Sequence, residues 1–463
     1  MAAVFTLAQL VFVVPRLGLS WDETVYVSQV SAHAPAAYFD TARARGISLL
    51  VAPVALLTSS VTALHVYLAL ASGLGLFLAL VVWRPLRPGW LLALAGLAFG
   101  GLWVTQYYGP QAMPDLWVAL SALAAVGFFL RAAGADRAWV TGRDVAARHP
   151  VRALAGLAGC MGCAALFRPG DAVFLAGFLA GAVILVARWR RWQLLAAIVA
   201  GLAAGGAEWV IEAYARFGGP LARLHAASRE QGGFGLHLGV WAQLRAVNGP
   251  TLCRPCLTGW HDPELSLWWL ALPLLAALGV WAARRAGRLG SSLLPAGCGL
   301  AVAVQYLFLI GYAAPRFLLP AYALLAIPVA DALGWLLTGV APRWREAATA
   351  LVGLGLTLQL LAQHAVLGHE VRGTVAFHAD YGVIAADLRK LGVIPPCVLK
   401  GDQFIPIAFL AGCASARSPA GAKRVAVLEQ PGVHPPRYAR HWQRHRLPGT
   451  GVLKLVAYLP PHD

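Results

Sequence analysis

The chain has 463 residues, of which 59% are hydrophobic and only 12% are charged. Soluble globular domains usually contain about 25% charged residues, so this composition excludes an ordinary soluble protein and indicates a polytopic membrane protein. The formal net charge is +17. Most of the basic residues lie in short segments between apolar runs, which predicts orientation in a membrane and argues against a nucleic-acid partner.

Apolar stretches long enough to cross a bilayer, about 20 residues each, recur along the chain. The first has no basic residue before it and no small-residue cleavage site ahead of Trp21, so we expect it to be an uncleaved span. The sequence predicts eleven transmembrane helices, at 2–19, 62–83, 90–106, 113–130, 153–168, 172–187, 194–213, 266–283, 292–312, 317–338 and 347–367.

Arginines lie in alternate loops between these spans, and the positive-inside rule makes such loops cytoplasmic. The opposite face then receives two external loops, 20–61 and 214–265, and everything after His369. We therefore expect a multi-pass protein of the cell membrane with an extracytoplasmic C-terminus. The cytoplasmic loops contain Arg84 and Arg87, the run from Arg131 to Arg152, Arg188, Arg190 and Arg191, Arg284, Arg285 and Arg288, and Arg343 and Arg345.

The last part of the chain has a different pattern and predicts a second domain. Residues 1–367 form the transmembrane domain and residues 368–463 a small extracytoplasmic α/β domain. Helical periodicity in 380–393 and 404–413 alternates there with strand-like segments at 397–401, 423–430 and 451–459. About 95 residues are enough to bury a separate core.

Seven cysteines divide into two groups. Cys160, Cys163 and Cys298 lie in apolar runs, whereas the other four lie in polar segments of the expected external face, where an oxidising compartment permits disulfides. We expect the pairs Cys253–Cys256 and Cys397–Cys413.

The CxxC of the first pair also fits a redox motif or half of a zinc site. His261 is close in sequence, but no second CxxC is present to complete four ligands.

The loop from Ser20 to Pro53 is the candidate active site. Asp22 and Glu23 stand side by side just after the first span. Ser20 could cap a helix with both acids in its first turn, which is an ordinary structural arrangement. The same loop also contains Arg43 and Arg45, and charges beside membrane spans are costly unless they serve a site or reach water.

Other charged residues of the same face extend this site. Asp115 in the turn QYYGPQAMPD either caps the next span or faces the cavity beside Asp22, together with Tyr107, Tyr108 and Gln111. Asp171 is more simply a cap. Glu208 and Glu212 share one helix face and either line the cavity or border it.

Arg168 and Arg316 lie in short outer turns, where the orientation rule disfavours basic residues. A bound phosphate would explain them, and so would snorkelling to lipid headgroups or pairing with a nearby acid.

These features resemble multispan glycosyltransferases of the GT-C type that use lipid-phosphate sugars, such as protein O-mannosyltransferases and the aminoarabinose transferases acting on lipid A. The resemblance rests on Asp22 and Glu23, on Asp115, on RFLLPAYALL from Arg316, and on the external C-terminal domain. The first loop departs from those subfamilies, because it reads RARGISLLVAP where they have a proline-rich PPL segment. The bias toward Arg, Ala and Gly over Lys is typical of GC-rich coding and hints at an actinobacterial source.

The resemblance implies a polyprenyl-phosphate sugar donor and inverting transfer to a hydroxyl of a lipid, glycan or protein acceptor. Asp22 is then the catalytic carboxylate, supported by Glu23 and Asp115. Arg316, helped by Arg43, Arg45 or Arg168, would stabilise the leaving phosphate.

Asp22 and Glu23 could instead hold a divalent cation, as in some GT-C enzymes. Two other functions remain open: a transporter or flippase of lipid-linked sugars, and a non-catalytic envelope assembly protein.

Overall fold

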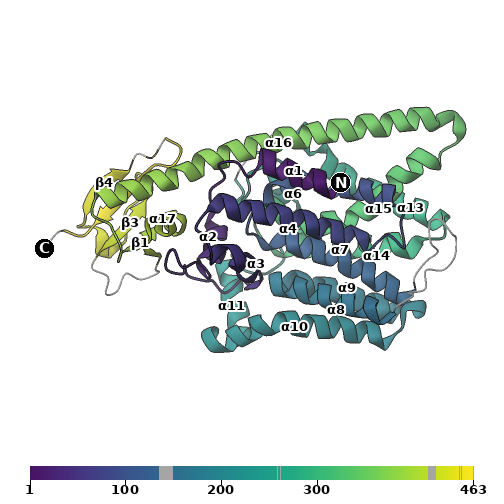
Figure 1. Ribbon diagram of the computed structural model, residues 1–463, viewed down its shortest axis with the longest axis horizontal. Coiled ribbons are helices and arrows are strands. Elements are labelled where there is room, and N and C mark those ends of the chain that lie inside the picture. Colours follow the sequence, from purple (N-terminus) through teal and green to yellow (C-terminus); the bar gives the residue numbers. More distant parts are fainter. Residues whose placement is uncertain are drawn as a thin grey trace.

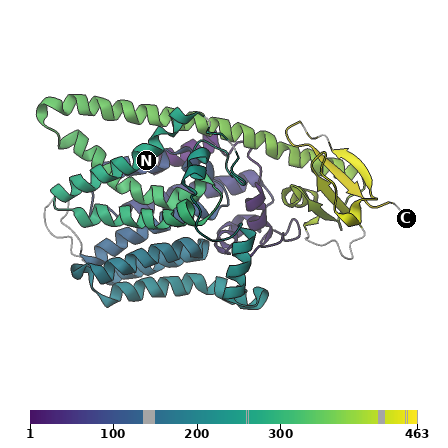
Figure 2. The same cartoon turned by 180° about the vertical axis from the view of Figure 1, so that it is seen from behind.

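The computed structural model describes residues 1–134, 150–257, 259–260, 262–415, 424–447, 449 and 451–461. His261 and most of the run from Arg131 to Arg152 lie outside this part of the chain. A helical bundle and a small sheet domain occupy opposite ends of an elongated molecule, and the long helix α16 (Pro342–Lys390) runs from one to the other (Figures 1 and 2).

The bundle contains a helix at each of the eleven expected spans. Eight helical segments of the described residues are long and apolar enough to cross a membrane, which indicates a multi-pass membrane protein. Three of the expected spans correspond to the shorter α1 (Ala2–Phe12), α5 (Gly89–Gly100) and α9 (Pro169–Leu185), so the number of crossings stays a prediction. The eight are α4 (Val61–Val81), α7 (Pro114–Ala133), α8 (Pro150–Phe167), α10 (Trp192–Phe217), α13 (Leu267–Arg285) with the preceding turn, α14 (Leu289–Val304) with its continuation to Leu309, α15 (Leu319–Thr338) with the preceding turn from Pro315, and α16.

Helix α15 is the centre of the bundle, and its apolar window is entirely buried. It packs against α5, α7, α13 and α14. A Cβ at Gly279 of α13 would lie 1.7 Å from the carbonyl oxygen of Pro328 in α15, so only glycine allows this close approach. Small residues at helix contacts are the usual means of close packing in membranes.

A buried ion pair joins the Arg-rich end of the bundle to α15. The guanidinium of Arg87 donates from Nε to Asp331 Oδ1 and from Nη2 to Asp331 Oδ2, both at 2.8 Å, and from Nη1 to Ser291 Oγ at 2.8 Å. Both charged side chains are only 2% exposed. The sequence places Arg87 among the basic residues expected in a cytoplasmic loop. In the structure its side chain is buried and joins this loop to α14 and α15.

The expected external loop 20–61 contains two helices, α2 (Trp21–Ser28) and α3 (Gly46–Ala55). Ser20 begins α2 with a capping box, in which its hydroxyl accepts from the Glu23 N–H and the Glu23 carboxylate accepts from the Ser20 N–H. The other expected loop, 214–265, contains α11 (Pro220–Glu230) and α12 (Val240–Ala246).

The C-terminal domain is a five-stranded mixed sheet with strand order β2-β1-β3-β5-β4. β1 (Val398–Gly401) lies parallel to β2 (Ala414–Ser415) and β3 (Val425–Glu429), whereas β5 (Leu455–Leu459) is antiparallel to β3 and β4 (Gln443–Leu447). The expected α/β domain is therefore present. A disulfide joins Cys397 to Cys413 across α17 (Phe404–Ala411).

The sheet domain packs directly on the candidate loop. Phe404 at the start of α17 contacts Trp21, with ring centroids 5.3 Å apart, and Ile405 and Phe409 share a buried cluster with side chains of α2 and α3. The domain boundary expected at 367/368 lies within α16. This helix of 49 residues is about 74 Å long at 1.5 Å per residue.

Removing one partner of the buried Arg87–Asp331 pair should destabilise the bundle. We expect Asp331→Ala to lower the free energy of unfolding by about 3–5 kcal/mol, because the Arg87 guanidinium is left buried without its counter-ion. Arg84→Gln, at an exposed arginine of the same loop, is the matched control. Thermal unfolding in detergent measures both, and equal midpoints for the two variants would contradict the assignment.

Candidate active site

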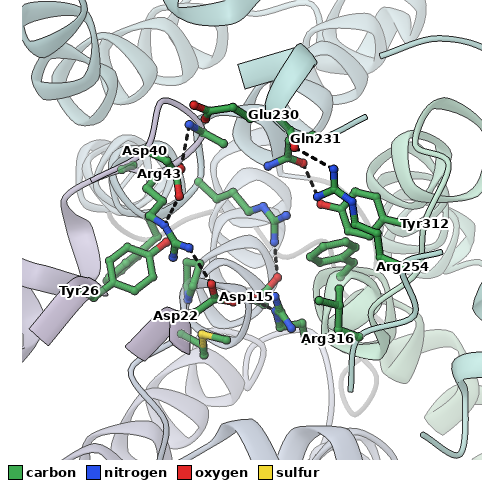
Figure 3. Close-up of a pocket in the computed structure, with 18 residues that line it drawn as sticks. Asp22, Tyr26, Asp40, Arg43, Asp115, Glu230, Gln231, Arg254, Tyr312 and Arg316 are labelled. Atoms are coloured by element: carbon green, nitrogen blue, oxygen red, sulfur yellow. Dashed lines mark hydrogen bonds and ion pairs between the residues drawn. The ribbon is translucent and has the colours of Figure 1, made fainter. Parts of the chain in front are cut away.

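A cavity of about 400 Å³ opens where α2, the 40–44 loop, the N-termini of α7 and α9, and the turns near 252 and 316 converge (Figure 3). Four carboxylates and four guanidiniums line it. The lining residues are Asp22, Tyr26, Asp40, Ala42, Arg43, Ala44, Met113, Pro114, Asp115, Phe167, Arg168, Glu230, Gln231, Leu252, Arg254, Tyr312, Arg316 and Phe317.

Asp22 lies in the first turn of α2 and is held between two arginines (Figure 3). Its Oδ1 accepts from Arg43 Nη2 at 2.6 Å, and its Oδ2 accepts from Arg316 Nη2 at 3.0 Å. The side chain is 27% exposed, so the cavity reaches it. Burial acts to raise the pKa of Asp22, but the charges of Arg43 and Arg316 outweigh it and lower that pKa below its ordinary value.

Asp115 begins α7 and is almost fully buried. Its Oδ1 accepts from Arg168 Nη1, and Arg316 Nε lies 3.4 Å from its Oδ2. The guanidinium of Arg316 therefore bridges the carboxylates of Asp22 and Asp115. These three residues, which lie far apart in the sequence, form one charged group at the cavity wall.

Arg43 is positioned by a loop that a buried arginine organises. Arg43 Nε donates to Asp40 Oδ2 at 2.5 Å. Arg223 of α11 is 0% exposed and donates to the backbone oxygens of Thr41 and Arg43 at 3.0 and 2.8 Å. Arg223 also pairs with Glu212 at 3.0 Å. Arg223 therefore holds the 40–44 loop from the side away from the cavity. Its role was not expected from the sequence.

The opposite wall also contains residues that the sequence analysis missed. The Arg254 guanidinium stacks on the Tyr312 ring, 4.8 Å from its centroid, and its Nη2 donates to the Glu230 backbone oxygen at 2.8 Å. The Tyr312 hydroxyl donates to Gln231 Oε1 at 2.9 Å. Within the described ranges, Arg254 forms no ion pair with a carboxylate. The only sequence signal was its position inside the CxxC.

Glu23 lies outside the cavity, contrary to the expectation that it shares the site with Asp22. Consecutive residues of a helix point about 100° apart, so the two carboxylates face different neighbours. Glu23 is 0% exposed. Its Oε1 lies 3.0 Å from both His65 Nε2 and the Ala112 N–H nitrogen, and its Oε2 accepts from the Ser20 N–H at 3.0 Å. Glu23 thus links α2 to α4 and to the turn before Asp115.

The surroundings of Glu23 favour its ionised form. Burial acts to raise its pKa, but the His65 imidazole and the two backbone N–H groups outweigh burial and lower that pKa. Asp22 and Glu23 do not fit a shared cation, since both oxygens of each are directed to other partners. No group of three or more His, Cys, Asp or Glu arranged to hold a metal is found in the described part of the chain.

Four other expected cavity residues also lie behind its wall. Arg45 Nη2 donates to Glu212 Oε1 at 2.6 Å, and the Arg45 backbone N–H donates to Glu208 Oε2 at 3.4 Å. The Tyr107 hydroxyl lies 2.7 Å from Thr374 Oγ1, and Gln111 Nε2 donates to the Tyr107 backbone oxygen at 2.8 Å. These residues stabilise the backbone and helices that form the cavity wall.

Tyr108 was also expected to line the cavity, but it is buried and does not belong to the lining. Tyr108 and Asp171 instead contact arginines of the cavity. The Tyr108 ring centroid lies 5.6 Å from Arg316 Cζ. Asp171 is more than the simple cap that we expected. It accepts from Gln305 Nε2 at 2.5 Å and from the Tyr306 hydroxyl, and so connects α9 to the end of α14 next to Arg168.

No family model and no curated protein matches this sequence. Among solved structures, the chain is similar to ArnT from Cupriavidus metallidurans bound to undecaprenyl phosphate, with a TM-score of 0.67, 15% identity, and 98% of this chain and 96% of that chain covered. The apo state of ArnT gives a TM-score of 0.65 at the same identity and coverage.

The archaeal oligosaccharyltransferase AglB from Archaeoglobus fulgidus, in complex with an inhibitory peptide and a dolichol-phosphate, gives a TM-score of 0.51 at 13% identity, covering 89% of this chain and 63% of that chain. The expected GT-C-like fold, a polytopic helical bundle with a small C-terminal α/β domain, is therefore confirmed. At such low identity the likeness shows the fold alone.

The buried carboxylate of Glu23 should matter for stability. All the groups around it can act as donors, so the amide NH₂ of Glu23→Gln must face at least one donor, and we expect a loss of about 1–3 kcal/mol. Because the pKa of Glu23 is lowered in the folded state, this contribution is present above pH of about 4.3 and disappears as the pH falls through the folded-state pKa. Denaturant unfolding at several pH values tests it. A loss no larger than that of Glu264→Gln, an exposed control, would contradict the role of Glu23.

Proposed function

We propose that the protein is a membrane glycosyltransferase that transfers a sugar from a polyprenyl-phosphate donor to an acceptor hydroxyl, with inversion at the anomeric carbon. The observation that carries the proposal is Asp22, which reaches the cavity between the guanidiniums of Arg43 and Arg316. The fold shared with ArnT, whose structure holds undecaprenyl phosphate, supports a lipid-phosphate donor. The acceptor is a lipid, a glycan or a protein.

The cavity contains the two groups that this reaction requires. The acceptor hydroxyl needs a base within hydrogen-bond reach, which is the role of Asp22. The departing phosphate gains negative charge as its bond to the sugar breaks, and Arg316, Arg43, Arg168 and Arg254 can stabilise that charge. Arg254 was not expected from the sequence, whereas Arg45, which was expected here, lies behind the wall and cannot contact the phosphate.

The transfer follows from these positions. The acceptor oxygen attacks the anomeric carbon from the side opposite the phosphate, so the new bond forms as the carbon–oxygen bond to phosphate breaks and the configuration inverts. The proton of the acceptor hydroxyl passes to Asp22, and polyprenyl phosphate leaves as an anion held by the arginines.

Donor binding would also change the basicity of Asp22. In the free cavity both of its oxygens are occupied by guanidiniums, which makes it a weak base. A donor phosphate competes for the same guanidiniums, because bidentate arginine contacts suit phosphate as well as carboxylate. We propose that this competition releases Asp22 and raises its pKa when the acceptor hydroxyl needs a base.

An apolar groove of about 730 Å³ between α9 and α14 fits the lipid part of the donor. It begins at Val173, two residues after Asp171, and continues to Trp189 near the Arg-rich end of the bundle. A polyprenyl chain in the groove would bring its phosphate to Arg168. Gly177 and Gly181 line the groove and have no side chain that would fill it.

The reaction belongs on the outer face of the membrane under this proposal. The cavity adjoins α2, and α17 of the C-terminal domain packs on α2, so cavity and domain share one end of the bundle (Figure 1). The arginine-rich loops at the other end favour the cytoplasm by the positive-inside rule. The C-terminal domain is then extracytoplasmic.

Asp22→Asn should abolish transfer. The amide keeps the shape of the side chain but cannot take the acceptor proton, and loss of a general base typically costs about 10²- to 10⁴-fold in rate. Purified protein in liposomes with a radiolabelled donor measures transfer and donor translocation together. Transfer by Asp22→Asn within threefold of wild type would contradict the role of Asp22, and translocation without product by wild-type protein would favour a flippase.

Filling the groove should weaken binding of long-chain donors. We expect Gly177→Leu to raise the KM of a long-chain donor about tenfold or more, since each displaced methylene costs about 0.8 kcal/mol. The KM of a short-chain donor should change little. Gly159→Leu, at an exposed glycine of α8 with equally open surroundings, is the control. Equal effects of Gly177→Leu on both donors would place the lipid elsewhere.

A further inference from the structure

The cavity wall that contains Arg254 includes a disulfide bond. Cys253 and Cys256 are bonded to each other, so Arg254 lies inside a ring of only four residues. Cys253 is buried, and its backbone pairs with Ala313 in both directions, with N···O distances of 2.8 and 3.2 Å. The disulfide ring is thus attached to the turn that leads into Arg316.

The ring and this turn form the wall together. The Thr251 backbone oxygen lies 3.5 Å from both Arg316 Nη1 and the Tyr108 hydroxyl. On the other side of Cys253, the Arg254 guanidinium stacks on the Tyr312 ring. The backbone pairing of Cys253 with Ala313 thus lies between the segments that contain these two arginines.

The side chains packed around the ring are small. Its buried cluster consists of Cys253, Ala246 and Ala313, with Ala242 and Cys256 packed against it. The two half-cystines are the largest side chains of this cluster, and the others are alanines. Arg254 itself is exposed and is fixed mainly by the Tyr312 ring and the Glu230 backbone oxygen.

We propose that the Cys253–Cys256 disulfide positions Arg254 for binding the donor phosphate. The closed ring limits the backbone conformations available to Arg254, so its guanidinium remains over Tyr312 at the cavity before the ligand arrives. Preorganisation of this kind strengthens binding by removing the entropic cost of ordering a long side chain. The inference rests on the proposed function only for the identity of the ligand, a lipid-linked phosphate.

Reduction of this bond gives a direct test. A water-soluble phosphine supplies the two electrons: with one water molecule it converts the disulfide to two thiols and becomes a phosphine oxide. We expect reduction to raise the Kd of undecaprenyl phosphate, measured by titration of the detergent-solubilised full-length protein, about 3- to 10-fold, the cost of ordering one long side chain. Paired substitutions Cys253→Ser and Cys256→Ser should produce the same change without reductant.

The second disulfide provides the control. Cys397 and Cys413 lie in the C-terminal domain, away from the cavity lining. Protein with Cys397→Ser and Cys413→Ser should bind as tightly as wild type, and reductant should raise its Kd by the same factor as in wild type. An unchanged Kd when only Cys253–Cys256 is lost would overturn the inference.

Combination with Arg254→Gln shows whether the disulfide acts through Arg254. If it does, losing the disulfide in the Arg254→Gln background should have no further effect on the Kd. Full additivity of the two changes would contradict the proposal. A wild-type protein that binds undecaprenyl phosphate in this disulfide-dependent way and transfers no sugar would contradict the proposed function and support this inference.

Discussion

The pairing of Asp22 with Arg43 and Arg316 is the interaction on which the site depends. It joins α2, the 40–44 loop and the turn before α15, three elements from distant parts of the chain. The cavity lining contains four carboxylates and four arginines, so its formal charges cancel. Balanced charge lowers the cost of keeping many ionised groups in a poorly solvated site. Under the proposed function, a phosphate that binds Arg43 or Arg316 competes with Asp22 for these guanidiniums.

A second set of charged residues holds Asp22, Arg43 and Arg316 in place but does not line the cavity. Glu212 pairs with Arg45, Arg216 and Arg223, and Arg223 in turn fixes the backbone around Arg43. On the other side, Glu23 connects the start of α2 to the turn that precedes Asp115. The two adjacent acids of the first loop thus have different surroundings. Asp22 reaches the cavity, and Glu23 sets the position of Asp22 relative to Asp115.

The sequence predicted the parts of the fold and site that depend on composition and spacing. Apolar stretches identified the helices of the bundle. The acid pair beside the first span led to Asp22, and charged residues in short turns between spans led to Asp115, Arg168 and Arg316. The direction of each side chain depends on helix register, which is why Glu23 and Gln111 were assigned to the cavity although they lie behind it. Arg223 could not be recognised, because a basic residue in a polar helix is usually exposed and only the packing of α11 buries it.

Elements whose formation depends on tertiary contacts were also difficult to predict. The strand β4, with the sequence QRHRL, has the composition of an exposed loop, and it forms because β5 offers a free edge. The continuity of α16 through Gly368 is similar, since a single glycine lowers helix propensity by only about 1 kcal/mol. The sequence around Arg254 contains no motif that predicts a binding site. Its position at the cavity depends on the tertiary pairing of Cys253 with Ala313.

The pH dependence of kcat/KM for sugar transfer tests the central claim most directly, because it reports ionisation of the free enzyme. If Asp22 is the base and Arg43 lowers its pKa, then Arg43→Gln should move the acid limb of the profile to higher pH than in wild type. Arg254→Gln, which lacks contact with Asp22, should reduce kcat/KM without moving the limb. An acid limb at the same pH in wild type and Arg43→Gln would contradict the account.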